Sequence, residues 1–162
     1  MSFITKQMEE LAGNFGKNYT DRNAISLPET ELSYKELYGI TRTGMNRKFL
    51  GGFDRGMRVL EVDSNVGNQL LCLQNDGSRN LYGIQLRSYA VELSKSRTKG
   101  INIIQGSAFD IPFKDGFLIL FLPAGFSFTS PQGILTRFWM KCTGVRKSSY
   151  GVWSTMPRST PK

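Results

Sequence analysis

Seven residues that could contact a ligand lie at or just beyond the ends of three segments with the pattern of β-strands. They are Glu61, Asp63, Asn65, Gly67, Gln85, Ser107 and Ala108. Carboxylate and amide oxygens accept hydrogen bonds from hydroxyl groups, and the backbone amides that open a helix after Gly67 favour an anionic group. A loop that combines apolar and hydrogen-bonding side chains can hold a nucleobase. These residue types at these positions predict a site for a nucleoside-containing cofactor.

The elements that position these residues alternate between strand and helix. Short apolar segments at 58–62, 80–84 and 101–105 are predicted to be strands, and 68–74 and 89–99 are predicted to be helices. This order implies an α/β unit with a parallel sheet and right-handed crossovers. Ligands of such sheets bind beyond the carboxyl ends of the strands. The seven residues therefore share one edge of the predicted sheet.

The chain divides into three parts by its sequence pattern. Its 162 residues and 18.2 kDa fit one domain with a short appendage. Residues 1–57 are predicted to form an N-terminal helical segment, with one helix over 32–50 that ends at Gly51-Gly52. Residues 58–122 are predicted to be the cofactor-binding core, and residues 123–162 an irregular basic tail.

The composition excludes several kinds of chemistry. The sequence holds no histidine, which removes histidine general bases, Ser-His-Asp triads and histidine-ligated metals, and no metal site is predicted. Two cysteines, Cys72 and Cys142, cannot form a disulfide scaffold and suggest a reducing compartment. The start of the chain lacks a signal-peptide pattern, and the longest apolar run, 117–126, is too short to cross a bilayer. We expect a cytoplasmic protein without a membrane partner.

Several segments resemble motifs of a known family. Residues 59–67 look like motif I of the class I S-adenosylmethionine-dependent methyltransferases, in which an acid is followed by glycines at alternate positions. Residues 104–113 are similar to the loop that closes on the adenine. Residues 38–47 and 81–84 match more closely the bacterial methylases associated with pseudaminic acid biosynthesis. The resemblance covers roughly residues 10–117, and it is specific because several motifs occur together.

The resemblance implies a Rossmann-like sheet that binds S-adenosylmethionine and passes its methyl group to a small-molecule or sugar acceptor, such as a nonulosonic sugar intermediate. Glu61 and Gly67 would frame the methionine part, and Ser107 and Ala108 would lie against the adenine. No residue is identified as a catalytic base.

Two residues depart from the family pattern. Gln85 occupies the position of the ribose-binding acid, so that a neutral hydrogen bond replaces a charge-assisted one. Asp63 stands where the family has glycine, and its added bulk is expected to hinder the approach of the cofactor.

The charge of the chain changes near Phe117. All 13 acidic residues precede residue 116, whereas 116–162 contain six basic residues and no acid. The loss of one nucleotide near Phe117 would explain this change, because shifting the frame back turns 138–141 into Leu-Asp-Glu and restores other family segments in order. The methyltransferase sheet would then be incomplete, although the apolar stretch 118–122 could still pair beside the first strand.

Two other interpretations of the chain stay open. The first is a truncated or frameshifted relic that is not catalytic and at most binds the cofactor. The second is a nucleic-acid-binding module that uses the basic tail, which includes Arg146 and Lys147 near Tyr150 and Trp153. A shifted frame yields such mixtures of basic and aromatic residues without selection, so a nucleic-acid partner is not expected.

Overall fold

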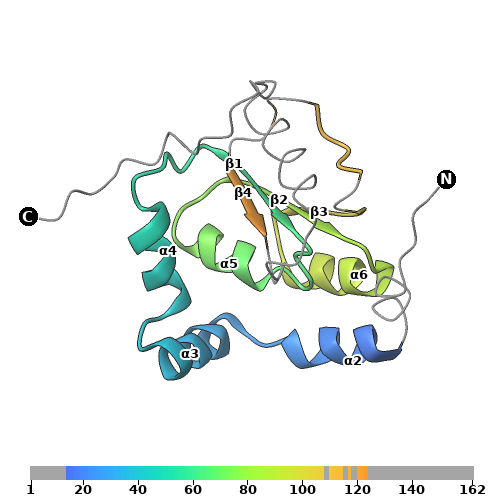
Figure 1. Ribbon diagram of the computed structural model, residues 1–162, viewed down its shortest axis with the longest axis horizontal. Coiled ribbons are helices and arrows are strands. Elements are labelled where there is room, and N and C mark those ends of the chain that lie inside the picture. Colours follow the sequence, from blue (N-terminus) through green and yellow to red (C-terminus); the bar gives the residue numbers. More distant parts are fainter. Residues whose placement is uncertain (1–13, 108–109, 115–116, 118–119, 124–162) are drawn as a thin grey trace, which may run out of the picture.

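A computed structural model describes residues 14–107, 110–114, 117 and 120–123. Its centre is a four-stranded parallel sheet in the order β3-β2-β1-β4 (Figure 1). The strands are β1 Arg58–Val62, β2 Asn80–Gln85, β3 Asn102–Gln105 and β4 Leu120–Pro123. The three predicted strands are confirmed, and β4 pairs with β1 as expected for the apolar stretch after Phe117. The rest of the predicted tail, 124–162, lies outside the described residues.

Two helices connect the first three strands and cover one face of the sheet. They are α5 Asn68–Asn75 and α6 Ser88–Arg97, and Figure 1 shows both on the same side of the strands. A core cluster joins these helices to the sheet through Val59, Leu70, Leu73, Leu81, Val91, Ile101 and Ile103. Full burial of each such side chain contributes about 1.5–3 kcal/mol, so this cluster fixes the helices on the sheet.

The opposite face of the sheet carries a second apolar cluster. Leu60, Val62, Ile84 and Ile111 are buried there, and the rings of Tyr82, Phe113 and Phe117 pack against them. The rings of Phe113 and Phe117 are stacked, with centroids 5.4 Å apart. Because side chains of a strand alternate between faces, the burial of Leu60 and Val62 here directs Glu61 to the face that α5 and α6 cover.

Among the described residues, three helices precede the sheet, and the prediction of one helix over 32–50 is wrong. The helices are α2 Asn14–Asn23, α3 Leu27–Tyr38 and α4 Arg42–Leu50. Gly39 ends α3 in the left-handed region, with φ 72°, and Thr41 caps α4 by accepting a hydrogen bond from the Gly44 amide. The apolar spacing continues across Gly39, but the left-handed glycine breaks the helix there.

Ion pairs and hydrogen bonds hold the N-terminal helices against the core. The carboxylate of Asp76, at the end of α5, lies 2.6 Å from Nε of Arg47 on α4 and 2.7 Å from Nη2 of Arg55. Asn68 of α5 donates to the backbone carbonyl of Asn23 at 2.7 Å. The start and end of α5 are thus both attached to the N-terminal segment. None of the helices within residues 14–97 is long and apolar enough to span a bilayer.

Candidate functional site

The strand register brings the predicted site residues that the structure describes to one edge of the sheet. Val62 pairs with Ile84, and Ile84 pairs with Ile104, so Asp63 and Gln85 follow at the same level beyond β1 and at the end of β2. The amide of Gly106 donates to the carbonyl of Gln85 at 3.0 Å, which carries the third loop to the same edge. This edge is the carboxyl end of the parallel sheet, where ligands of doubly wound folds bind.

The loop after β1 repeats a left-handed backbone conformation at alternate positions. Asp63, Asn65 and Gly67 have φ values of 59°, 47° and 80°. This conformation costs an ordinary L-residue about 1–2 kcal/mol, and aspartate and asparagine tolerate it better than other non-glycine residues. Asp63 and Asn65 therefore reproduce the backbone path that alternating glycines would give. Asp63 changes the side chain of this loop but keeps its path.

Asn65 gives a test of this left-handed loop. Asn65→Ala is expected to lower the free energy of unfolding by about 1 kcal/mol relative to Asn65→Gly, because alanine lacks the local hydrogen bonding of asparagine and the freedom of glycine. Urea unfolding of the two variants, with equal m-values, measures this difference. Equal stability of the alanine and glycine variants would mean that Asn65 does not hold a left-handed backbone.

Glu61 is a buried acid on β1, with 3% of its surface exposed. Its Oε2 atom has no hydrogen-bond partner among the described residues. Burial raises the pKa of Glu61 to about 8, while the positive charge of Arg42 acts to lower it and the negative charge of Asp63 acts to raise it. Glu61 is therefore mostly protonated at neutral pH. A cationic ligand placed beside it would ionise it and form a charge-assisted hydrogen bond.

Side chains of the N-terminal helices and of α5 hold the Arg42 guanidinium in place near Glu61. Nη1 of Arg42 donates to the hydroxyl of Tyr34 at 2.9 Å, and the guanidinium lies over the Tyr34 ring, 4.7 Å from its centroid. Arg42 Nε also donates to Oε1 of Gln69 on α5. Gln69 Nε2 in turn donates to Oδ1 of Asn46 at 2.9 Å. We predicted no role for Arg42 from the sequence. Its position within the family-like segment 38–47 was the signal that could have indicated one.

Gln85 and Asp63 form a direct pair at the edge of the sheet. Gln85 Nε2 donates to Oδ1 of Asp63 at 3.0 Å, and Gln85 Oε1 accepts from the backbone amide of Arg87 at 3.3 Å. Asp63 is exposed as a residue, but protein atoms around its carboxyl group partly shield that group from water. Burial raises the pKa of its carboxyl, and the hydrogen bond from Gln85 and the charge of Arg87 both lower it.

The third loop is described only in part. Ser107 forms an isolated bridge with Asp110, whose amide donates to the carbonyl of Ser107 at 3.1 Å. The structure therefore places Ser107 just beyond β3, near the other site residues. Ala108, the second residue predicted to contact a base, lies outside the described residues.

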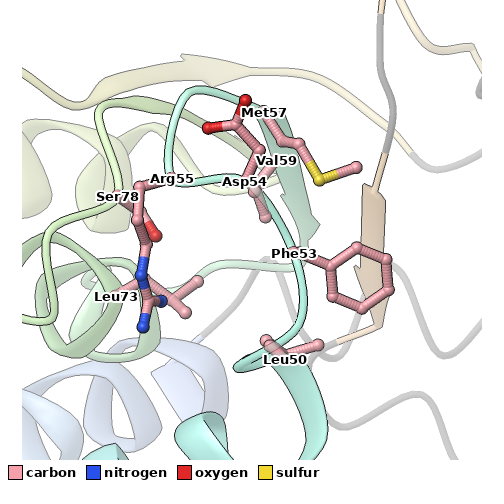
Figure 2. A pocket seen from close by; sticks show the side chains of 8 residues that line it. All are labelled: Leu50, Phe53, Asp54, Arg55, Met57, Val59, Leu73 and Ser78. Carbon is pink, nitrogen blue, oxygen red and sulfur yellow. The ribbon is translucent and has the colours of Figure 1, made fainter.

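A separate hollow lies near the start of β1, at the opposite edge of the sheet. Figure 2 shows its lining of Leu50, Phe53, Asp54, Arg55, Met57, Val59, Leu73 and Ser78. Its free space is about that of one water molecule. This hollow is too small for a cofactor. The polar residues at the carboxyl ends of the strands form the candidate site.

Solved structures of methyltransferases share this fold. A provisionally assigned S-adenosyl-L-methionine-dependent methyltransferase from Methanococcus maripaludis aligns with a TM-score of 0.64 at 13% identity, over 88% of this chain and 63% of its own. A SAM-dependent methyltransferase from Aquifex aeolicus aligns with a TM-score of 0.56 at 18% identity, over 78% of this chain and 66% of its own. Geranyl diphosphate C-methyltransferase from Streptomyces coelicolor, in complex with Mg²⁺, geranyl diphosphate and S-adenosyl-L-homocysteine, aligns with a TM-score of 0.55 at 12% identity, over 63% and 41%.

This chain shares the Rossmann-like α/β fold of these structures, which confirms the predicted fold class. No family model and no curated protein matches the sequence. This chain spans 41% to 66% of the length of the three solved structures. Because a fold hosts many activities, identities of 12% to 18% establish the fold and leave the activity to the chemistry of the site.

Proposed function

We propose that this chain binds S-adenosylmethionine and belongs to a methyltransferase. The observation that carries the proposal is the loop after β1, in which three left-handed residues at alternate positions follow a buried acid. The fold of the chain supports it, because one structure of the same fold was solved with S-adenosyl-L-homocysteine.

The residues at the edge of the sheet fit the groups of this cofactor. Glu61 Oε2 and Asn65 Oδ1 are buried oxygen atoms without a hydrogen-bond partner among the described residues, and both can accept from an ammonium group. The first amides of α5 face the same edge and suit a carboxylate. Ser107 would contact the adenine. The cofactor would supply an electrophilic methyl group on a sulfonium, and the residues of this chain would hold and orient it.

The methyl acceptor is part of the proposal and follows from the resemblance of segments 38–47 and 81–84. It is a small molecule or a sugar, such as a nonulosonic sugar intermediate. The described residues include no side chain that we assign as a catalytic base. The frameshift hypothesis bears on this point, because it places the acceptor-binding part of a complete enzyme in the region after Phe117. Resequencing the gene tests it directly.

Calorimetric titration of the full chain with S-adenosylhomocysteine tests the proposed cofactor. We expect saturable binding of one molecule per chain, and no binding of ATP at the same concentration. A chain that binds neither ligand would contradict the proposal. A different result would favour the nucleic-acid interpretation. In that case the chain would not bind S-adenosylhomocysteine, and it would bind single-stranded DNA much more strongly as the salt concentration is lowered.

A further inference from the structure

The side chain of Gln85 is buried and makes one hydrogen bond at each end of its amide group. Only 1% of its surface is exposed. Its carbonyl oxygen accepts from the Arg87 amide, and its nitrogen donates to the Asp63 carboxylate. This orientation of the amide is fixed by chemistry, because a backbone N–H only donates and an ionised carboxylate only accepts. A side chain so buried and so occupied at both ends suits a positioning role better than a ligand-binding role.

Asp63 differs from Gln85 in both its exposure and its hydrogen bonding. It is exposed, and its Oδ2 atom makes none of the side-chain hydrogen bonds found among the described residues. It lies level with Gln85 at the carboxyl edge of the sheet. It also holds a left-handed backbone, with φ 59°, where glycine would be the ordinary residue. Costly conformations of this kind concentrate at functional sites, so a functional role for the Asp63 side chain would account for its presence here.

We infer that Asp63 binds the ribose hydroxyls of the cofactor and that Gln85 positions the Asp63 carboxylate for this contact. The inference rests on the proposed function. A carboxylate that follows a strand at this edge is the group that binds ribose in dinucleotide-binding folds of similar topology. In this chain the acid is Asp63, which lies in the loop after β1. The amide side chain of Gln85, at the end of β2, holds its carboxylate by a hydrogen bond. This inference gives Asp63 a binding role, whereas the sequence alone led us to expect that its bulk hinders the cofactor.

Titration with S-adenosylhomocysteine and with its 2′-deoxy analogue tests the role of Asp63. The wild-type chain is expected to bind the analogue about tenfold more weakly, because a charge-assisted hydrogen bond is lost. Asp63→Asn keeps an acceptor for Gln85 but removes the charge. This variant is expected to bind S-adenosylhomocysteine about tenfold more weakly than wild type and to discriminate less between the two ligands.

Two further variants test the positioning role of Gln85. Gln85→Leu removes both hydrogen bonds and is expected to weaken binding, but adding it to Asp63→Asn is expected to cost little more, because the two residues act through one contact. The double variant Asp63→Gly with Gln85→Glu returns the acid to the end of β2 and gives the loop a glycine. It is expected to restore both the affinity and the discrimination against the 2′-deoxy analogue.

Glu36→Gln, which removes an exposed charge on α3, is the matched control and is expected to bind like wild type. The inference is overturned if Asp63→Asn binds both ligands as wild type does. It is also overturned if the losses from Asp63→Asn and Gln85→Leu simply add. A wild-type chain that does not bind S-adenosylhomocysteine overturns the proposed function itself, which separates the two failures.

Discussion

Replacing Glu61 with glutamine is expected to stabilise the protein increasingly as the pH rises from about 5 to 8. The wild-type pKa of Glu61 is raised from its ordinary value of 4.5 to about 8 by burial. Between these values the folded protein holds a proton that the unfolded chain has released. The free energy of unfolding therefore falls with rising pH in this window, on the order of 1 kcal/mol per pH unit. Glutamine is neutral at every pH, so the free energy of unfolding of the variant does not fall in this way as the pH rises.

Urea unfolding at pH 5, 6, 7 and 8 measures this effect of Glu61→Gln. The two stability curves are expected to meet near pH 5 and to separate by several kcal/mol, on the order of 3, at pH 8. Glu36→Gln, at an exposed site, is expected to follow the wild-type curve. Parallel curves for wild type and Glu61→Gln would show that Glu61 does not bind a proton in the folded state.

The same substitution is expected to weaken cofactor binding while it stabilises the fold. Glutamine cannot form a charge-assisted hydrogen bond with an ammonium group, so the affinity for S-adenosylhomocysteine is expected to fall about tenfold or more. The wild-type affinity is expected to rise from pH 6 to 8, because binding requires ionised Glu61, and that of the variant to stay flat. Destabilising groups kept for function are common at binding sites.

The regular part of the fold could be predicted because its signals are local. Each strand of the βαβαβ unit is a short apolar run, and each connecting helix has turn residues at its ends. The N-terminal helices were harder to predict, because the apolar spacing typical of a helix continues across Gly39 without interruption. Whether a glycine ends a helix depends on packing as well as on spacing. Here α4 turns to meet α5 through Asn46 and Gln69, which are 23 residues apart.

The site could be located from the sequence, but its internal contacts could not. The edge of the sheet follows from the strand order, and the residues beyond each strand follow from the edge. The hydrogen bond between Asp63 and Gln85, however, depends on the register of β1 against β2. The burial of Glu61 depends on side-chain alternation along β1 and on the cover that α5 provides. From the sequence, the bulk of Asp63 was therefore expected to outweigh its charge, because its backbone conformation and its partner Gln85 were not known.

Gly83→Ala is expected to destabilise the protein by about 2 kcal/mol, because β2 is tightly packed where it passes the site loop. A methyl group at Gly83 would lie 2.7 Å from Ser64 Oγ, 3.0 Å from Ile103 Cγ1 and 3.1 Å from Leu70 Cδ1. Gly52→Ala is the matched control, since that methyl would meet nothing within 4 Å. Its stability is expected to stay within about 0.5 kcal/mol of wild type.

A double variant separates the contact with Ser64 from the other two contacts of Gly83→Ala. Ser64 is 4% exposed, and its hydroxyl has no hydrogen-bond partner among the described residues, so Ser64→Ala alone is expected to cost little. In the Gly83→Ala background, Ser64→Ala removes the closest clash and is expected to restore about 1 kcal/mol. Because Ser64 lies between Asp63 and Asn65, affinity for S-adenosylhomocysteine is expected to fall in Gly83→Ala and to recover in the double variant. Recovery of stability without recovery of affinity would mean that this packing supports the fold but does not set the path of the site loop.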